Sequence, residues 1–243
     1  MGGRRKMHRT FYKYVLLFAA LGCSRDKAPS ADGARVEGSS TRRPAGASAA
    51  ATDSAGTPSS MPTVLFVGTS LTAGYGLDPD SAFPQQIQRM IDSAGLRYSV
   101  VNAGVSGETS SALLRRLDWL LRQSFAVVVI ETGANDGLRG IPIETMRANI
   151  QRIIERVRAE RPEARIALVQ MEAPPNLGAG YTRQFRSVFP ELARANNVVL
   201  LPFLLDQVAG ARELNQADGI HPNYDGERIV ARNVWKGLRP LLQ

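Results

Sequence analysis

Short apolar runs alternate with longer amphipathic segments through residues 61–243. Five of these runs are rich in β-branched or large apolar side chains and predict buried strands at residues 63–67, 98–101, 125–130, 166–169 and 198–201. Apolar residues recur at helical spacing over 143–157, and helices are also expected near 83–94, 108–122, 182–196 and 226–239. This alternation predicts an α/β fold with a five-stranded parallel sheet covered by helices on both faces.

The N-terminus has the pattern of an export signal. Residues 1–13 are basic, residues 14–21 form an apolar run, and small residues around Gly22 precede Cys23. The run is too short for an ordinary membrane span, which needs about 20 apolar residues. Residues 20–23, Ala-Leu-Gly-Cys, resemble a bacterial lipobox, although Ala20 stands where Leu is usual. We therefore expect residues 1–22 to be a signal peptide and Cys23 to be the lipid attachment site.

This N-terminal pattern predicts an extracytoplasmic protein in the periplasm or cell envelope, held to a membrane by the lipidated cysteine. Ordinary secretion and a buried structural cysteine are the alternatives. Residues 23–60 follow, and between Ser24 and Ser60 27 of 37 residues are Ala, Gly, Ser, Thr or Pro. Such a stretch buries too little apolar surface to fold, so it predicts a disordered tether in front of a single domain at residues 61–243.

The formal net charge of +8 and the pI near 10.1 suggest a polyanion partner until the charges are located. Five of the thirty Lys and Arg precede residue 14, and without residues 1–22 the excess falls to three positive charges. The arginines at 147, 152, 156 and 158 lie on the outer side of the predicted helix at 143–157, which is typical of a solvated face. Nucleic acid is therefore not an expected partner.

The chain has one cysteine and two histidines, His8 and His221. An intramolecular disulfide is excluded, and a structural zinc site with four sulfur or nitrogen ligands cannot be assembled. His8 lies in the predicted signal peptide, so any imidazole base in the mature domain must be His221. We expect neither a metal nor a cofactor.

Candidate chemistry follows the predicted strands at the edge where ligands bind in parallel sheets. After the first strand, Ser70 lies in the run Gly-Thr-Ser-Leu-Thr-Ala-Gly, where a sharp turn would expose its hydroxyl as a nucleophile. The run lacks the Lys-Ser/Thr of a phosphate loop and the third glycine of a dinucleotide fingerprint. Alone, the serine could equally be a helix cap.

Two further strand ends supply candidate hydrogen-bond donors. Either Gly104 or Gly107, after the second strand, could offer a backbone N–H to an oxyanion, and the sequence does not choose between them. Asn135, after the third strand, could point its amide at the same place. Near the C-terminus, Asp218 precedes His221 by three residues, a spacing that allows a carboxylate to orient the imidazole. Together these residues provide a nucleophile, oxyanion donors, a base and its orienting carboxylate.

The four segments that contain Ser70, Gly104 and Gly107, Asn135, and His221 together resemble the SGNH subgroup of the GDSL hydrolases. The resemblance extends over residues 62–243 and is strongest to the bacterial acyl-CoA thioesterase/arylesterase/lysophospholipase group. The resemblance implies a flavodoxin-like three-layer α/β/α sandwich and a serine esterase that forms an acyl-enzyme. By position it implies Ser70 as nucleophile, His221 as base and Asp218 as its partner. It selects Gly107 over Gly104, so that Ser70, Gly107 and Asn135 form the oxyanion hole. Thr69 stands where the family name has Asp.

The expected partner is a small acyl ester or thioester, and a monomer is the expected state. Two alternatives stay open at this point: a carbohydrate acetyl-esterase of the same fold, and a non-catalytic module that binds lipid or glycan. Residues 172–181, which contain two prolines and two glycines after the fourth strand, are expected to form a wall of the acyl pocket.

Overall fold

The computed structural model describes residues 61–243, and the predicted signal peptide, tether and Cys23 lie outside the described residues. Five parallel strands form one sheet in the order β2-β1-β3-β4-β5. The strands are β1 Thr63–Gly68, β2 Ser99–Gly104, β3 Val127–Ile130, β4 Arg165–Gln170 and β5 Val199–Phe203. The predicted parallel α/β sheet is therefore confirmed, and this strand order is that of flavodoxin-like folds.

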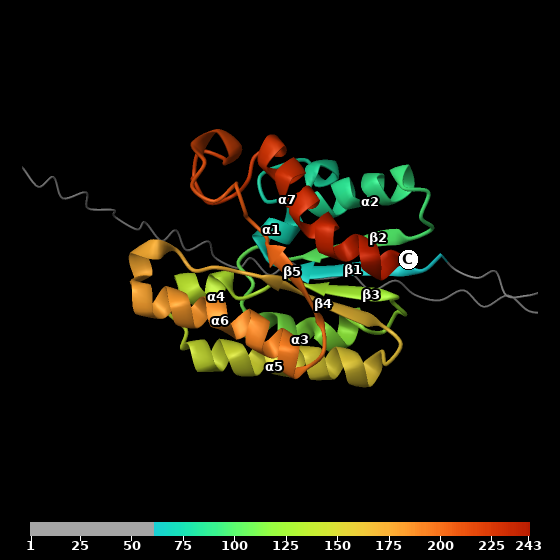
Figure 1. The fold of residues 1–243 in the computed structure, drawn as a ribbon, viewed down its shortest axis with the longest axis horizontal. Coiled ribbons are helices and arrows are strands. Elements are labelled where there is room, and N and C mark those ends of the chain that lie inside the picture. Colours follow the sequence, from blue (N-terminus) through green and yellow to red (C-terminus); the bar gives the residue numbers. More distant parts are fainter. Residues whose placement is uncertain (1–60) are drawn as a thin grey trace, which may run out of the picture. The chain divides into compact units, whose positions relative to one another are not determined.

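Helices cover both faces of the sheet (Figure 1). The helices are α1 Ser70–Ala73, α2 Phe83–Ser93, α3 Ser110–Leu120, α4 Ala134–Leu138, α5 Ile143–Glu160, α6 Ala179–Ala195 and α7 Tyr224–Leu238. α1, α2 and α7 lie on one face, and α3, α5 and α6 lie on the other. Short 3-10 turns occupy Pro79–Ser81, Pro175–Leu177, Arg212–Leu214 and Arg239–Leu242. The predicted helices are present, with ends displaced by no more than three residues, because local caps decide where a helix begins.

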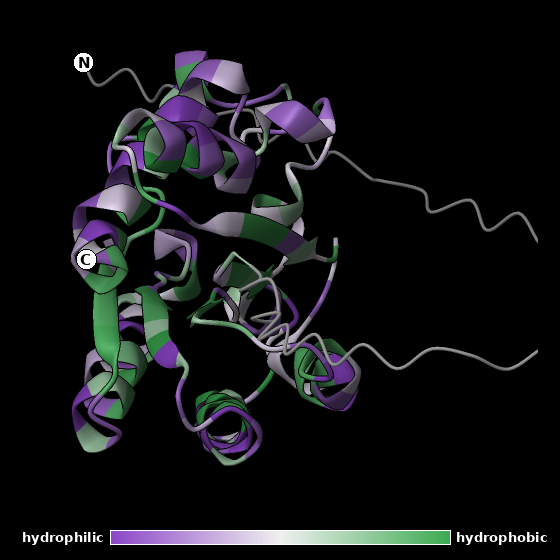
Figure 2. Ribbon diagram, turned by 90° about the vertical axis from the view of Figure 1, so that its right-hand side faces the viewer, coloured by the Kyte–Doolittle hydropathy of each residue, from purple (hydrophilic) through white to green (hydrophobic). Residues whose placement is uncertain are grey.

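The core lies between the sheet and these two helical layers. All four residues of the central strand β3 are buried, because helices cover it above and below. Figure 2 shows helices seen end-on that are hydrophobic toward the sheet and hydrophilic on the outward side. Within residues 61–243 no helix is both long and apolar enough to span a membrane.

The topology decides where a site can form. The chain leaves β1 toward β2 on one side, and later leaves β3 toward β4 on the other. The loops after β1 and β3 therefore diverge at a crevice between two neighbouring strands, which is where doubly wound sheets bind ligands. Ser70 follows β1 and Asn135 follows β3, so the fold brings both to this crevice.

Candidate active site

A tight turn between β1 and α1 presents Ser70. β1 ends at Gly68, and Thr69 caps α1 by accepting the Leu71 N–H with its hydroxyl at 3.3 Å. A Cβ at Gly68 would overlap the Thr72 hydroxyl, so only glycine allows the turn to close this tightly. Ser70 is the first helical residue, and its backbone N–H therefore has no acceptor inside the helix.

His221 reaches Ser70 from the loop in front of α7. Its Nε2 lies 2.9 Å from Ser70 Oγ, across a separation of 151 residues. Its Nδ1 lies 2.6 Å from Asp218 Oδ2, while Asp218 Oδ1 accepts the backbone N–H groups of Ile220 at 2.9 Å and of His221 at 3.0 Å. The tilted ring of Tyr75 packs on the imidazole, with centroids 4.7 Å apart. The structure thus brings the three predicted side chains into one hydrogen-bonded chain.

The charge on Asp218 determines which nitrogen of His221 carries the proton. The hydrogen bond from the His221 side chain, with the two backbone N–H groups, lowers the pKa of Asp218 to about 2. The carboxylate is therefore ionised at neutral pH and accepts from Nδ1–H. In neutral imidazole this leaves a lone pair on Nε2, which accepts the Ser70 O–H.

The structure separates the two candidate glycines. Gly104 is part of β2 and its N–H donates to Asn102 Oδ1 at 2.9 Å, so it is not available to a substrate. A Cβ there would overlap the Ala73 backbone. Gly107 lines the same pocket as Ser70, and its φ of +77° is a left-handed conformation that favours glycine. Arg139 holds this turn by donating to the Gly107 carbonyl at 2.8 Å.

Asn135 lies in the first turn of α4, across the pocket from the β1 loop. Its Nδ2 donates one hydrogen bond to the Glu108 carbonyl at 3.0 Å, which fixes the side chain and leaves the second amide hydrogen for a ligand. The neighbouring Asp136 is fully buried and accepts both the N–H and the hydroxyl of Ser110. Asp136 therefore ties α4 to the start of α3.

One cleft of about 270 Å³ joins these groups, and Ser70, Gly107, Asn135 and His221 all line it. The rest of its wall is mainly apolar and consists of Leu71, Tyr75, Ala134, Leu138, Met171, Phe203, Leu205 and Ile220, with Thr69, Ser106 and Glu172 as its polar members. The expectation that residues 172–181 form a pocket wall was wrong for all but Glu172, because the chain turns away there into a 3-10 turn and α6. Within residues 61–243 no group of three or more potential metal ligands occurs.

Comparisons with known proteins identify the family of the chain. A family model described as the GDSL-like lipase/acylhydrolase family matches residues 66–229. The chain belongs to the GDSL-like lipase/acylhydrolase family. Esterase TesA of Pseudomonas aeruginosa is 39% identical over 181 residues, which cover 74% of this chain and 89% of that protein. Thioesterase 1/protease 1/lysophospholipase L1 of Escherichia coli K12 is 38% identical over 181 residues, with 74% and 85% covered.

The fold of this GDSL-like protein is also that of solved relatives. The crystal structure of TesA matches with a TM-score of 0.71, covering 74% of this chain and 99% of that chain. The psychrotrophic esterase EstA from Pseudoalteromonas sp. is 35% identical and matches with a TM-score of 0.70, covering 74% and 98%. The flavodoxin-like sandwich and the family assignment are confirmed, and the protein is a carboxylic ester hydrolase.

The sequence analysis did not identify a buried glutamate, Glu131, that contacts the turn presenting Ser70. Glu131 follows β3 directly and is 1% exposed. Its Oε2 accepts the Thr69 N–H at 2.7 Å and the hydroxyls of Thr69 and Thr72, both at 2.9 Å. Burial raises the pKa of Glu131, and these donors partly offset the rise. Thr69, which departs from the family name, therefore serves as a donor that ties the serine turn to β3.

A second buried carboxyl group belongs to Glu227, which lies in the first turn of α7, shortly after His221 in the sequence. Its Oε2 accepts the Phe83 N–H at 2.7 Å, which joins α7 to the start of α2. Burial raises the pKa of Glu227 to about 8; the Phe83 hydrogen bond opposes this rise and the charge of Glu131 adds to it. An acidic residue directly after an apolar strand, as at Glu131, is the one sequence signal for such a group.

Glu227→Gln should make the protein more stable in alkali than the wild type. Between pH 4.5, the ordinary pKa of a glutamate, and about pH 8, Glu227 stays protonated in the folded state but is ionised in the unfolded state. Stability therefore falls as pH rises through that window, and it stays low above it. Glutamine keeps the acceptor for Phe83 without this titration, so denaturant unfolding should give similar stabilities at pH 5 and a more stable variant at pH 9. An unchanged difference at the two pH values would contradict the raised pKa.

Proposed function

We propose that the protein hydrolyses acyl esters and thioesters by a Ser70-His221-Asp218 triad, with Ser70, Gly107 and Asn135 as the oxyanion hole. The observation that carries the proposal is the continuous hydrogen-bonded chain from Ser70 Oγ through His221 to Asp218, with distances of 2.9 and 2.6 Å. A serine hydroxyl is a weak nucleophile unless a base accepts its proton, and this geometry provides that base.

Each step follows from these positions. Ser70 Oγ attacks the carbonyl carbon while its proton passes to His221 Nε2, and Asp218 stabilises the imidazolium. The negative oxygen of the tetrahedral intermediate faces the Ser70 and Gly107 N–H groups and the free amide hydrogen of Asn135. Collapse expels the alcohol or thiol, which takes the proton from His221. Water, deprotonated by the same imidazole, then attacks the acyl-enzyme, and the acid leaves with Ser70 regenerated.

The shape and chemistry of the cleft favour an acyl or aryl substrate. Its wall presents Leu138, Phe203 and Ile220 beside the reacting groups, and a volume of about 270 Å³ suits a short or medium acyl chain. Relatives named esterase, arylesterase and thioesterase/lysophospholipase support ester and thioester bonds as the target class. Sugar recognition requires several converging polar groups, and beyond the proposed catalytic residues this wall offers only Thr69, Ser106 and Glu172 among mainly apolar side chains, so the carbohydrate acetyl-esterase alternative is less well supported.

A panel of p-nitrophenyl esters and an acetylated sugar tests the substrate class. We expect kcat/KM to rise from acetate to hexanoate and to be at least about tenfold higher on the hexanoate than on the sugar acetate, because each buried methylene contributes about 0.8 kcal/mol. Leu138→Glu, at the pocket wall, should remove most of this chain-length gain. Leu177→Glu is the matched control, because Leu177 is also exposed but lies outside the cleft. A preference for the sugar would contradict the proposal.

The export signal, the tether and the extracytoplasmic location remain predictions, because they fall outside the described residues. We propose lipidation of Cys23 from the sequence alone. Cys23→Ala should release the protein from salt-washed membranes of the producing cell into the soluble fraction while esterase activity is retained, because salt screens a purely electrostatic contact with the lipid surface. Membrane association that is unchanged in this variant would contradict an anchor at Cys23.

A further inference from the structure

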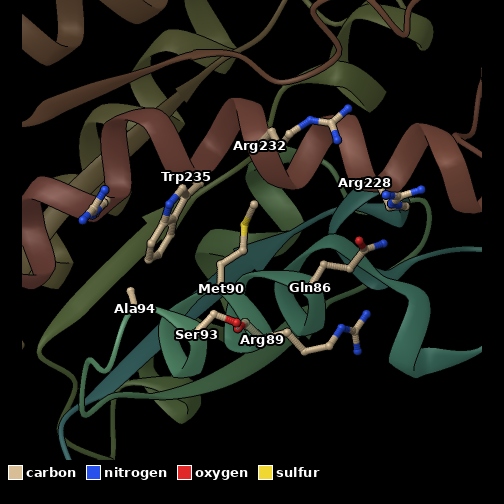
Figure 3. Close-up of a pocket in the computed structure, with 9 residues that line it drawn as sticks. Gln86, Arg89, Met90, Ser93, Ala94, Arg228, Arg232 and Trp235 are labelled. Carbon is tan, nitrogen blue, oxygen red and sulfur yellow. The ribbon is translucent and has the colours of Figure 1, made fainter.

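The layer of α2 and α7 carries a groove that shares no lining residue with the active-site cleft. Its volume is about 550 Å³. Figure 3 shows Met90 of α2 and Trp235 of α7 lying between the two helices. Both side chains are half-buried and pack against the core, so the floor of the groove is apolar and fixed in place.

Four arginines surround this floor: Arg89 on α2, Arg228 and Arg232 on α7, and Arg239 just after α7. All four are exposed. Arg228 has a single loose ion pair, with Asp225 at 3.5 Å, and Arg89 donates to the Asp80 backbone carbonyl at 3.0 Å. Within residues 61–243, Arg232 and Arg239 make no ion pair. The groove therefore keeps an excess of positive charge.

Two arginines on the opposite layer are paired with carboxylates. Arg156 forms a two-pronged pair with Asp118, with both hydrogen bonds at 2.7 Å. Arg147 pairs with Glu191 at 2.7 Å. In the described part of the chain, other arginines of that layer, such as Arg152, make no ion pair but do not line the α2/α7 groove. The α2/α7 face is therefore distinguished by four arginines gathered around one apolar floor.

We propose that the α2/α7 groove binds the surface of an anionic phospholipid membrane. From Arg228 to Arg239 the cations extend over about 16 Å of helix, which is more than one phosphate can occupy and fits several neighbouring headgroups. Guanidinium groups match phosphate oxygens in pairs. An indole and a thioether between the cations suit the apolar boundary of a lipid headgroup layer better than a purely ionic polymer.

The position of the groove is compatible with catalysis at the membrane. The groove residues of α7 lie beyond the first turn of the helix, whereas His221 precedes that turn. A domain docked by this face keeps the cleft at the carboxyl ends of the strands uncovered. Docking and turnover of a soluble ester are therefore separable, and the groove can be altered without touching the catalytic groups.

Vesicle binding of the full chain tests the proposal. In a Trp119→Phe background, Trp235 is the only tryptophan, because the chain has two. Titration with phosphatidylglycerol vesicles should change Trp235 emission, and phosphatidylcholine vesicles should not. Arg228→Gln/Arg232→Gln should weaken binding to the anionic vesicles at least about tenfold, with hydrolysis of p-nitrophenyl acetate unchanged, because each cation near such a surface contributes about 1 kcal/mol.

Arg152→Gln/Arg183→Gln is the matched control, since it removes the same charge from exposed positions outside the groove. Every variant has the same N-terminal segment, so any contribution of that segment is common to all variants. Unchanged vesicle binding in the groove variant, or equal losses in both variants, would overturn the proposal. If inorganic phosphate or a soluble polyanion such as heparin changed Trp235 emission more than the vesicles do, the proposal would also be overturned, in favour of a soluble anion site.

Discussion

His221→Ala should lower kcat/KM by at least about 10⁴-fold while the fold stays intact. The imidazole is 2.9 Å from Ser70 Oγ and is the only base in contact with that hydroxyl within residues 61–243. Without it the serine keeps its proton at neutral pH. Initial rates on p-nitrophenyl hexanoate at pH 8, with circular dichroism to verify folding, measure the loss. A loss below about tenfold would mean that another group accepts the proton.

Asp218→Asn is the informative companion variant. The carboxylate both holds the Nδ1–H tautomer and stabilises the imidazolium, and an amide can do only part of this. The Asp218 side chain is 38% exposed, so water can replace some of its effect. We therefore expect a smaller loss than for His221→Ala, about 10²- to 10⁴-fold. Equal activity of the variant and the wild type would remove Asp218 from the proposed triad.

The wild-type pH profile should show a single proton on its acid side. His221 can accept the serine proton only as the neutral imidazole. The lowered pKa of Asp218, about 2, keeps the carboxylate ionised down to pH 4, so it adds no second step. A plot of log kcat/KM against pH should therefore have a limiting slope of one. A slope of two, or flat activity down to pH 4, would contradict this assignment.

Asn135→Ala should lower kcat by about 10²- to 10³-fold and change KM little. Asn135 lines the cleft, and in the proposed mechanism its second amide hydrogen meets the oxyanion, which forms only in the transition state. An interaction of that kind contributes to kcat and not to substrate binding. Steady-state kinetics on p-nitrophenyl hexanoate separate the two constants.

The same side chain also holds the Glu108 carbonyl at 3.0 Å, so a structural loss must be distinguished. Asn135→Asp keeps the side-chain volume and removes the amide donor, and it should be as inactive as the alanine variant. Thermal unfolding of both variants gives the structural part of the effect. Near-normal kcat in either variant, or a rise in KM that accounts for the whole loss, would exclude Asn135 from the oxyanion hole.

The sequence was sufficient for the sheet, because its three central strands, β1, β3 and β4, contain apolar runs that a sheet covered on both faces buries. It also placed Ser70 and Asn135 at one edge, because each follows a strand of a parallel sheet, and it selected His221 as the one histidine after the predicted signal peptide. The choice of Gly107 needed the structure or the family, since it depends on Gly104 being engaged by Asn102 and on the positive φ at 107.

Contacts between distant segments were beyond the sequence. Glu131 meets Thr69 across 62 residues, and Glu227 meets Phe83 across 144, so apart from the position of Glu131 directly after an apolar strand, no local pattern shows that these carboxyl groups are buried. The arginines of α2 and α7 form one cluster only because the two helices pack together and leave Trp235 and Met90 between them. The pocket wall was misplaced for the same reason, because prolines and glycines mark a turn without giving its direction.

The most direct measurement of the central claim, an activated serine at position 70, is intact mass spectrometry after reaction with a fluorophosphonate. Such a probe reacts with a serine only when a neighbouring base and an oxyanion hole activate it. The wild type should gain one adduct, located on Ser70 by peptide mapping, and Ser70→Ala should gain none. A wild-type chain without an adduct, or an adduct that persists in Ser70→Ala, would contradict the account and favour a non-catalytic binding module or a different nucleophile.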